Sequence, residues 1–329
     1  MPVTTRRRNG KRRTPLPVKL LLTLLIIGAI IIAILLIWSL AAGLLRPPKP
    51  TPPGKEEPTS QPADCPDVFL LSVPGTWESN SNDDPYNPSA NPVSLMLNIS
   101  NPIRERFPNE RLEVYTVPYV AQFSNPIAVP PDGQASYNVS RTEGTGRATA
   151  RLKEVYDHCP LTTYVFAGFS QGAVIAGDIA ESVGAGKGPV PANKVLGVML
   201  IADGRRDVGQ PGQATEIGQS PGGVGAEVAL KGFNMLGITM TGPRSGFGDL
   251  TDRTYTICAP GDLICDAPKN ALAPVNVLGS IGTLVKAVGN PVHSLYNGFV
   301  VDDNGTTATQ WTVGWATGLI ENAPHPAHS

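Results

Sequence analysis

The stretch TYVFAGFSQGAVIAGDIAESV (163–183) decides the fold of this chain of 329 residues. Its first six residues are uncharged and mostly apolar, which is typical of a strand buried on both faces. The residues after Gly172 have the pattern of a helix. Between the two lies GFSQG (168–172), whose small residues on either side of Ser170 allow a sharp turn that exposes the hydroxyl. The stretch therefore predicts a nucleophilic serine at a strand–helix junction.

A second match to the same pattern, GQSPG (218–222), fails in its context. The residue after Ser220 is Pro221, which has no N–H to donate to an oxyanion. No apolar strand precedes this match and no helix pattern follows it directly. We therefore assign the nucleophile to Ser170.

Short apolar runs alternate with helical patterns through much of the chain. Strands are expected at 68–73, 112–117, 163–168, 195–200 and 253–257, and helices near 92–106, 141–157, 171–184 and 307–321. Ser140 followed by Glu143 predicts a capping box at the start of the second helix. This alternation predicts an α/β fold, with a parallel sheet covered by helices on both faces.

Two stretches interrupt the alternation, the glycine-rich residues 204–249 and the apolar residues 266–292. The second holds one possible helix, near 276–288. Both follow the carboxyl ends of strands, where sheets of this kind place their sites. Either stretch is a candidate for a lid over the substrate. For the first stretch, a surface loop without a function is an equally good interpretation.

The general base is found by elimination among four histidines. His158 precedes Ser170, whereas folds with a G-x-S-x-G elbow order the chain as serine, acid, histidine. His325 and His328 lie in a proline-containing tail that we expect to fray. His293 is therefore the predicted base.

The acid that orients the imidazole should lie between Ser170 and His293. Asp262 follows the strand near 253–257 and lies between Cys258 and Cys265. A loop closed by a disulfide at the end of a strand holds a carboxylate rigidly, and this favours Asp262 as the acid. Asp266 and Asp203 are the fallback candidates, and Asp262 as a simple turn residue is the alternative.

An oxyanion hole needs a second donor besides the N–H of Gln171. The sequence VPGTWE (73–78) follows the first strand, and Gly75-Thr76 brings a backbone N–H and a hydroxyl to that end of the sheet. We therefore expect Thr76 and Gln171 to form the hole.

The four cysteines, Cys65, Cys159, Cys258 and Cys265, favour two disulfides in an exported domain. The short spacing of Cys258 and Cys265 favours a local loop, which leaves Cys65 to pair with Cys159. A metal site is the alternative, but there is no C-x-x-C spacing. We expect no metal and no cofactor.

The amino-terminal region has the pattern of a membrane anchor. Residues 1–19 hold seven of the 26 basic residues, and residues 20–45 are 26 positions without a charge. Such a run is long enough to span a bilayer, and the basic residues before it indicate a cytoplasmic tail. The remainder is then expected outside the plasma membrane, on the side of the cell wall. A cleaved signal peptide, with Ala41-Ala42-Gly43 as a weak cleavage site, is the alternative.

The rest of the chain divides into three predicted parts. Residues 46–64 hold seven prolines and predict an extended linker. A folded domain is expected at 65–323 and a flexible tail at 324–329. The whole chain is nearly neutral, but residues 1–19 hold seven basic residues and no acidic residue precedes Glu56. The rest of the chain is therefore net acidic, which argues against a nucleic-acid partner.

The domain resembles the cutinase family, especially the membrane-anchored cutinase-like esterases of mycolate-bearing actinobacteria. The resemblance rests on GFSQG (168–172), on YTICAPGDLIC (255–265), on VHSLY (292–296), and on GTWE (75–78) and ADGRR (202–206). It implies a cutinase-like α/β-hydrolase with a five-stranded parallel sheet and three layers. It also implies two disulfides, a Ser170/Asp262/His293 triad and an oxyanion hole from Thr76 and Gln171.

The expected function is hydrolysis of carboxylic esters or thioesters of fatty acids or lipids at the cell envelope, through an acyl-enzyme on Ser170. An acyltransferase with the same triad is one alternative, because the sequence does not distinguish water from another acceptor. A catalytically inactive protein that binds the cell wall is the other. The sequence leaves the acyl chain and the oligomeric state open.

Overall fold

The computed structural model describes residues 24–33, 58–125, 128–269 and 290–329. The chain separates into two units, Met1–Glu56 and Glu57–Ser329. In the first unit, residues 24–33 form a helix. Within the ranges just given, no helix is both long enough and apolar enough to cross a membrane. The rest of the predicted span, most of the linker and the predicted helix at 276–288 lie outside the described residues.

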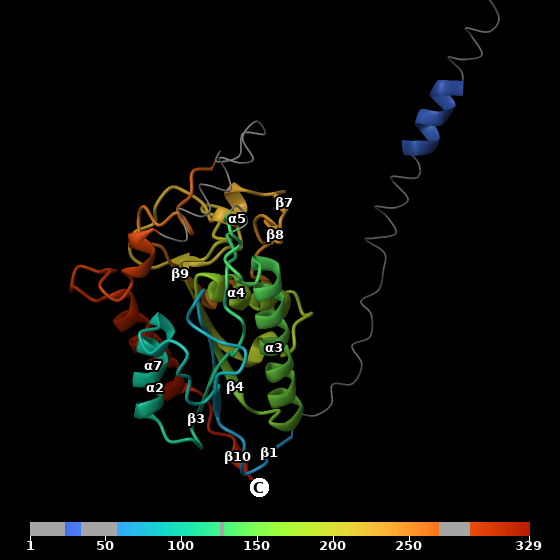
Figure 1. Ribbon diagram of the computed structural model, residues 1–329. Coiled ribbons are helices and arrows are strands. Elements are labelled where there is room, and N and C mark those ends of the chain that lie inside the picture. Colours follow the sequence, from blue (N-terminus) through green and yellow to red (C-terminus); the bar gives the residue numbers. More distant parts are fainter. Residues whose placement is uncertain (1–23, 34–57, 126–127, 270–289) are drawn as a thin grey trace, which may run out of the picture. The chain divides into compact units, whose positions relative to one another are not determined.

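A parallel sheet of six strands, in the order β3-β2-β4-β5-β9-β6, is the centre of the second unit (Figure 1). The strands are β2 Val68–Val73, β3 Leu112–Thr116, β4 Thr163–Phe169, β5 Val195–Ile201, β6 Thr215–Glu216 and β9 Thr254–Ile257. The five predicted strands are confirmed, each to within one residue at either end. The prediction of five strands in total was wrong, because β6 adds a short sixth strand beside β9. Its two polar residues carry no apolar run that a sequence pattern could reveal.

Helices cover both faces of this sheet, as predicted (Figure 1). Their bounds are α2 Leu95–Arg106, α3 Tyr137–His158, α4 Gln171–Gly184 and α7 Ala308–Asn322, with short 3-10 turns η1 Ala192–Lys194, η2 Gly248–Arg253 and η3 Pro291–Ser294. The start of α3 differs from the prediction. Ser136 is its N-cap and accepts from the N–H of Val139, so Ser140 lies inside the first turn. The expected capping box of Ser140 and Glu143 was therefore wrong.

Alternate residues of each strand enter two separate cores, one on each face of the sheet. On β2, Phe69 and Leu71 pack with α3 and α4, whereas Val68 and Leu70 pack with α2 and α7. All of these strand residues are buried. The central strands β2, β4 and β5 are thus buried on both faces, which explains why their sequences are uncharged and mostly apolar.

The glycine-rich residues 204–249 form a structured insertion between β5 and β9. Besides β6 and the first two residues of η2, it contains α5 Ala226–Ala229 and the hairpin of β7 Asn234–Met235 and β8 Ile238–Thr239. In Figure 1 these elements gather at one end of the unit, above α4. They contribute most of a small buried cluster, which we call the insertion core: Phe123, Tyr137, Ala226, Leu230, Phe233, Ile238 and Met240.

The two ends of the second unit pair with each other. β1 Ser60–Gln61 and β10 Ala327–His328 form a two-stranded parallel sheet. Asp67 binds both tail histidines, with 3.0 Å from its carboxylate to each ring, and also forms an ion pair with Arg111 at 2.8 Å. The predicted limits of 65 and 323 were therefore too narrow. The predicted flexible tail at 324–329 is instead a paired strand with its flanking residues.

Candidate active site

Ser170 lies in the turn between β4 and α4, with φ 57° and ψ −121°. This backbone conformation is unusual for a residue other than glycine, and it is maintained by close packing around the turn. A Cβ at Gly168 would lie 2.4 Å from the carbonyl oxygen of Gly172, and a Cβ at Gly172 would lie 2.1 Å from that of Val73. Both glycines of the predicted turn are thus needed for the chain to fold as it does.

The three residues predicted as a triad form one continuous chain of contacts. His293 Nε2 lies 2.8 Å from Ser170 Oγ, and His293 Nδ1 lies 2.9 Å from Asp262 Oδ2. Asp262 is completely buried, whereas Ser170 is 6% exposed. A hydroxyl, an imidazole and a buried carboxylate in this order can move a proton from the hydroxyl to the imidazole.

The carboxylate of Asp262 is held from several sides. Its Oδ1 accepts from the N–H of Ile264 at 3.0 Å, and its Oδ2 accepts from the hydroxyl of Tyr296 at 2.7 Å. The disulfide between Cys258 and Cys265 closes the loop around it. Burial, and then the charge of Asp262, raise the pKa of Tyr296 well above its ordinary value, so this hydroxyl keeps its proton. Tyr296 belongs to the quoted VHSLY stretch, but its role was not predicted.

The imidazole of His293 is positioned by an aromatic stack and a short loop. Its ring lies 4.9 Å from that of Phe169, nearly parallel to it. Asn290 caps η3 by accepting from Val292, and its amide donates to the carbonyl of Gly261 at 2.7 Å. The histidine loop is therefore tied directly to the loop that carries Asp262.

Thr76 and Gln171 both line the pocket that contains Ser170. Gln171 is the first residue of α4, so its N–H belongs to the unpaired amino end of that helix. Its side-chain amide oxygen accepts from the hydroxyl of Ser140 at 2.8 Å, and Ser140 in turn accepts from the N–H of Gln122 at 3.0 Å. Ser140 thus orients Gln171, a role that sequence reasoning missed because it made this residue a helix cap.

A second carboxylate, that of the partly buried Glu78, supports the loop that carries Thr76. It accepts from the N–H of Gly75 at 2.9 Å and from the N–H of Leu95, at the start of α2. Burial raises the pKa of Glu78 above its ordinary value, although both N–H groups oppose this shift. The loop after the first strand is therefore fixed to α2 through one side chain.

A pocket of about 340 Å³ opens at Ser170 and contains side chains from both faces of the sheet. Leu95, Ser294 and Asn297 line it on the side of α2 and the histidine loop, and Phe123 and Met240 line it on the side of the insertion. This volume is at the small end of the range for ligand pockets. The glycine-rich stretch thus contributes a wall of the pocket.

The two fallback acids have other partners. Asp203 forms a buried ion pair with Arg244, with Nη1 2.5 Å from Oδ2. Asp266 accepts from the N–H groups of Gly223 and Gly261 and so fixes a loop. Of the three candidates, only Asp262 reaches His293.

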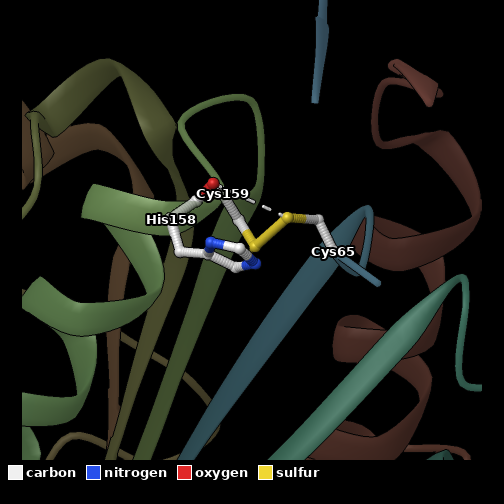
Figure 2. Close-up of side chains that lie close together, drawn as sticks. All are labelled: Cys65, His158 and Cys159. Carbon is white, nitrogen blue, oxygen red and sulfur yellow. Dashed lines mark hydrogen bonds between the residues drawn. A yellow bond between two sulfur atoms is a disulfide. The ribbon is translucent and has the colours of Figure 1, made fainter. Parts of the chain in front are cut away.

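Cys65 and Cys159 form the second disulfide, so both predicted pairings are confirmed. With His158 they are the one group in the described part of the chain whose composition and spacing fit a metal site. Figure 2 shows the two sulfur atoms bonded to each other beside the imidazole of His158. Because metals bind thiolates, a disulfide does not offer these sulfurs as ligands. The imidazole lies instead 3.0 Å from Asp64.

A parallel sheet with a serine on a strand–helix elbow, followed in the chain by an aspartate and a histidine, defines the α/β-hydrolase class. Sequence comparison narrows the class: a profile of the cutinase family matches residues 87–279. The chain is also 46% identical over 288 residues to a carboxylesterase Culp6 homolog from Corynebacterium glutamicum, which covers 84% of this chain and 88% of that protein. The chain therefore belongs to the cutinase family and is a carboxylic ester hydrolase, which confirms the resemblance stated above.

Solved structures that are similar to this chain include a cutinase-like protein from Cryptococcus sp., with 18% identity and a TM-score of 0.46 over 82% of this chain and 100% of that one. The catalytic core domain of acetyl xylan esterase from Trichoderma reesei has 17% identity and a TM-score of 0.45, over 79% of this chain and 100% of that domain.

Proposed function

We propose that the chain hydrolyses fatty-acyl esters or thioesters through an acyl-enzyme on Ser170. The observation that carries this proposal is the chain of contacts from Ser170 through His293 to the buried Asp262. Ser170 lies in a pocket lined mainly by apolar side chains, and such a lining binds an acyl chain better than a polar group.

In the first half of the reaction, His293 Nε2 removes the proton from Ser170 Oγ while Oγ forms a bond to the substrate carbonyl carbon. The carbonyl electrons move onto its oxygen. When this oxyanion collapses, the bond to the leaving oxygen or sulfur breaks, and Nε2–H gives its proton to the leaving group. The acyl group then remains on Oγ as an ester.

In the second half, His293 Nε2 removes a proton from water as the water oxygen attacks the acyl carbon. The bond from that carbon to Oγ breaks, Oγ regains its proton and the carboxylic acid leaves. Asp262 accepts from Nδ1–H throughout and so keeps Nε2 free to act as the base.

Thr76 and Gln171 are proposed to bind the oxyanion, through the N–H of Gln171 and the N–H or hydroxyl of Thr76. Their support is that both line the pocket beside Ser170 and that Ser140 and Glu78 fix their surroundings. Loss of one such donor typically costs about 2.7–4 kcal/mol of transition-state stabilisation.

The test is Ser170→Ala in the purified full-length chain, with p-nitrophenyl octanoate as substrate and a fluorophosphonate probe. We expect the wild type to turn over the ester and to be labelled, and the variant to do neither. Full turnover by the variant contradicts the nucleophile. Absence of both turnover and labelling in a folded wild type would favour an inactive binding protein instead.

We further propose that the enzyme works outside the plasma membrane and is held there by residues 20–45. The support is the uncharged run of 26 residues after a basic segment, together with two disulfides, which persist in oxidising compartments. Alkaline phosphatase fused after Ser329 is expected to be active in cells. An inactive fusion protein contradicts the location, and an Edman sequence starting after Gly43 would mean a cleaved signal peptide.

A further inference from the structure

The residues that line the pocket form two groups of different chemistry, which we call its two arms. On the side of the histidine loop, Ser294 and Asn297 follow His293 closely in sequence and line the pocket. On the other side, the walls come from the insertion core, through Phe123, Tyr137, Ala226 and Met240. The first arm is partly polar and open, because Ser294 and Asn297 are exposed, whereas these four residues of the second arm are buried.

The proposed mechanism assigns a role to each arm. His293 must give its proton to the leaving group, so the leaving alcohol or thiol lies on the side of His293, beside Ser294 and Asn297. The acyl chain then extends the other way, past Val174 and toward Met240. This direction follows from the position of the proton donor and does not depend on the kind of ester.

The charged side chain that lines the second arm is already fully hydrogen-bonded, so it is not free to bind a polar group at the tail of a substrate. This side chain is Glu227, and its carboxylate already accepts from the hydroxyl of Tyr137, from Arg141 at 3.0 and 3.1 Å, and from the N–H and hydroxyl of Thr241. A carboxylate has about four acceptor sites, so these donors saturate it. An unsubstituted hydrocarbon tail therefore suits this arm best.

The wall at Met240 is fixed by its backbone neighbours. Arg205 donates to the carbonyl of Gly242 at 2.8 Å and to that of Pro243 at 3.1 Å. Arg244 pairs with Asp203 and with Asp178, at 2.5 and 2.9 Å. The segment after Met240 is thus held to β5 and α4 by buried charges, so the wall does not yield freely to a longer chain.

We infer that the pocket-lining part of the insertion core forms a binding subsite for the tail of an unbranched, medium-length acyl chain, and that Met240 and Ala226 set the upper limit of its length. The inference rests on the proposed function, because it takes the position of the acyl carbon from Ser170. The wild type is expected to have its highest kcat/KM with acyl chains of medium length and a much lower value with palmitoyl.

The test compares p-nitrophenyl butyrate, octanoate, laurate and palmitate, each below its solubility limit, on the full-length chain. Met240→Ala removes part of the end wall. Because each additional buried methylene is worth about 0.8 kcal/mol, or about fourfold in kcat/KM, the ratio of palmitate to octanoate is expected to rise about tenfold or more. Ala226→Leu fills the subsite and is expected to lower kcat/KM for octanoate and laurate while butyrate is little changed.

Ile238→Ala is the matched control, because Ile238 belongs to the insertion core but does not line the pocket. It should lose stability as Met240→Ala does and keep the wild-type chain-length profile. Unchanged profiles in both Met240→Ala and Ala226→Leu, or an equal shift in Ile238→Ala, overturn the inference. In that case a loss of turnover in Ser170→Ala would still support the proposed function, so the two failures can be told apart.

Discussion

The hydroxyl of Tyr296 links three parts of the candidate site. It accepts from the N–H of Ala259 at 3.0 Å, donates to Asp262 and belongs to a ring that lies edge-on to Phe169. It fixes the carboxylate that must in turn orient His293. We therefore regard it as a positioning residue, one step removed from the reacting atoms.

Tyr296→Phe tests this role. The ring and its packing remain, but Asp262 loses one donor. A hydrogen bond to a charged group is worth about 1.5–3 kcal/mol, which corresponds to a kcat lower by about ten- to 150-fold. KM should be little changed, because Tyr296 does not line the pocket. Tyr86→Phe, which removes an exposed hydroxyl bonded to Glu113, is the control. An unchanged kcat in a correctly folded Tyr296→Phe variant contradicts the role.

Glu78 should give the fold a pH dependence of defined sign. A carboxyl whose folded-state pKa is raised binds its proton more tightly in the folded chain. Its contribution to the free energy of unfolding is fully present below the unfolded-state pKa, and it is lost as the pH rises through the folded-state pKa. The wild type should therefore lose stability relative to Glu78→Gln as the pH rises above the ordinary pKa of a glutamic acid, about 4.3.

Urea unfolding of both chains at a series of pH values measures this difference. Glu110→Gln, which removes an exposed carboxylate, controls for the change of net charge. If the difference in free energy of unfolding between wild type and Glu78→Gln stays constant across these pH values, the predicted role of Glu78 is wrong.

Individual site residues differed in how well the sequence revealed them. Ser170, His293 and Asp262 could be predicted because the fold prescribes their order and the chain offers few candidates. Tyr296 and Glu78 could not, because their roles come from the way distant loops meet. No local pattern distinguishes a tyrosine that bonds an aspartate 34 positions away from one that merely packs.

At the level of elements, the two disulfides close loops of very different size. Cys65 and Cys159 are 94 positions apart, whereas Cys258 and Cys265 are seven apart. If cross-links act by restricting the unfolded chain, the long loop contributes about 4.7 kcal/mol and the short one about 2.5 kcal/mol. Of the three triad residues, only Asp262 lies within either loop, and its loop is the short one.

Loss of the long-loop disulfide should therefore affect mainly stability, and loss of the short-loop disulfide should affect mainly activity. Replacing Cys65 and Cys159 by alanine is expected to lower the melting temperature more and to leave kcat unchanged where the chain is still folded. Replacing Cys258 and Cys265 should lower it less but reduce kcat by about ten- to a hundredfold, because Asp262 loses its rigid loop. Calorimetry and initial rates measure the two effects. Equal losses of kcat in both double variants would refute the distinction.

The length and burial of the strands and helices explain why some of them could be predicted from the sequence and others could not. β2, β4 and β5 are buried on both faces, so each has an unbroken apolar sequence that the turn residues delimit. β6, α5, β7 and β8 contain two to four residues each and have no periodicity. Long-range ion pairs such as Arg244 with Asp203 hold the insertion in place, and these are invisible in a local pattern.

On the scale of the whole second unit, the pairing of β1 with β10 should contribute measurably to stability. A chain ending at Ala323 loses the contacts of His325 and His328 with Asp67, and the backbone bond from Ser329 to Gln61. We expect its free energy of unfolding to fall by about 1–3 kcal/mol in urea titrations. A chain that lacks only Ser329 should lose less.

Activity should survive this truncation. Gln61 accepts from the N–H of Leu161, just before β4, whereas Ser170 follows the other end of the same strand. Seven residues of strand span roughly 23 Å. A kcat that falls together with stability, measured where both chains are folded, would mean that the two ends of the sheet are coupled.

Because Ser60 and Ser329 lie side by side, with their hydroxyl oxygens 2.9 Å apart, the unit is suited to circular permutation. A short glycine bridge across this gap, with new ends opened in the exposed turn at Gly209 and Gln210, would leave every strand of the large sheet intact. For the same reason, a bead or a fusion partner attached at either natural end of the unit would lie at the opposite pole from the pocket mouth and leave it clear for the incoming ester.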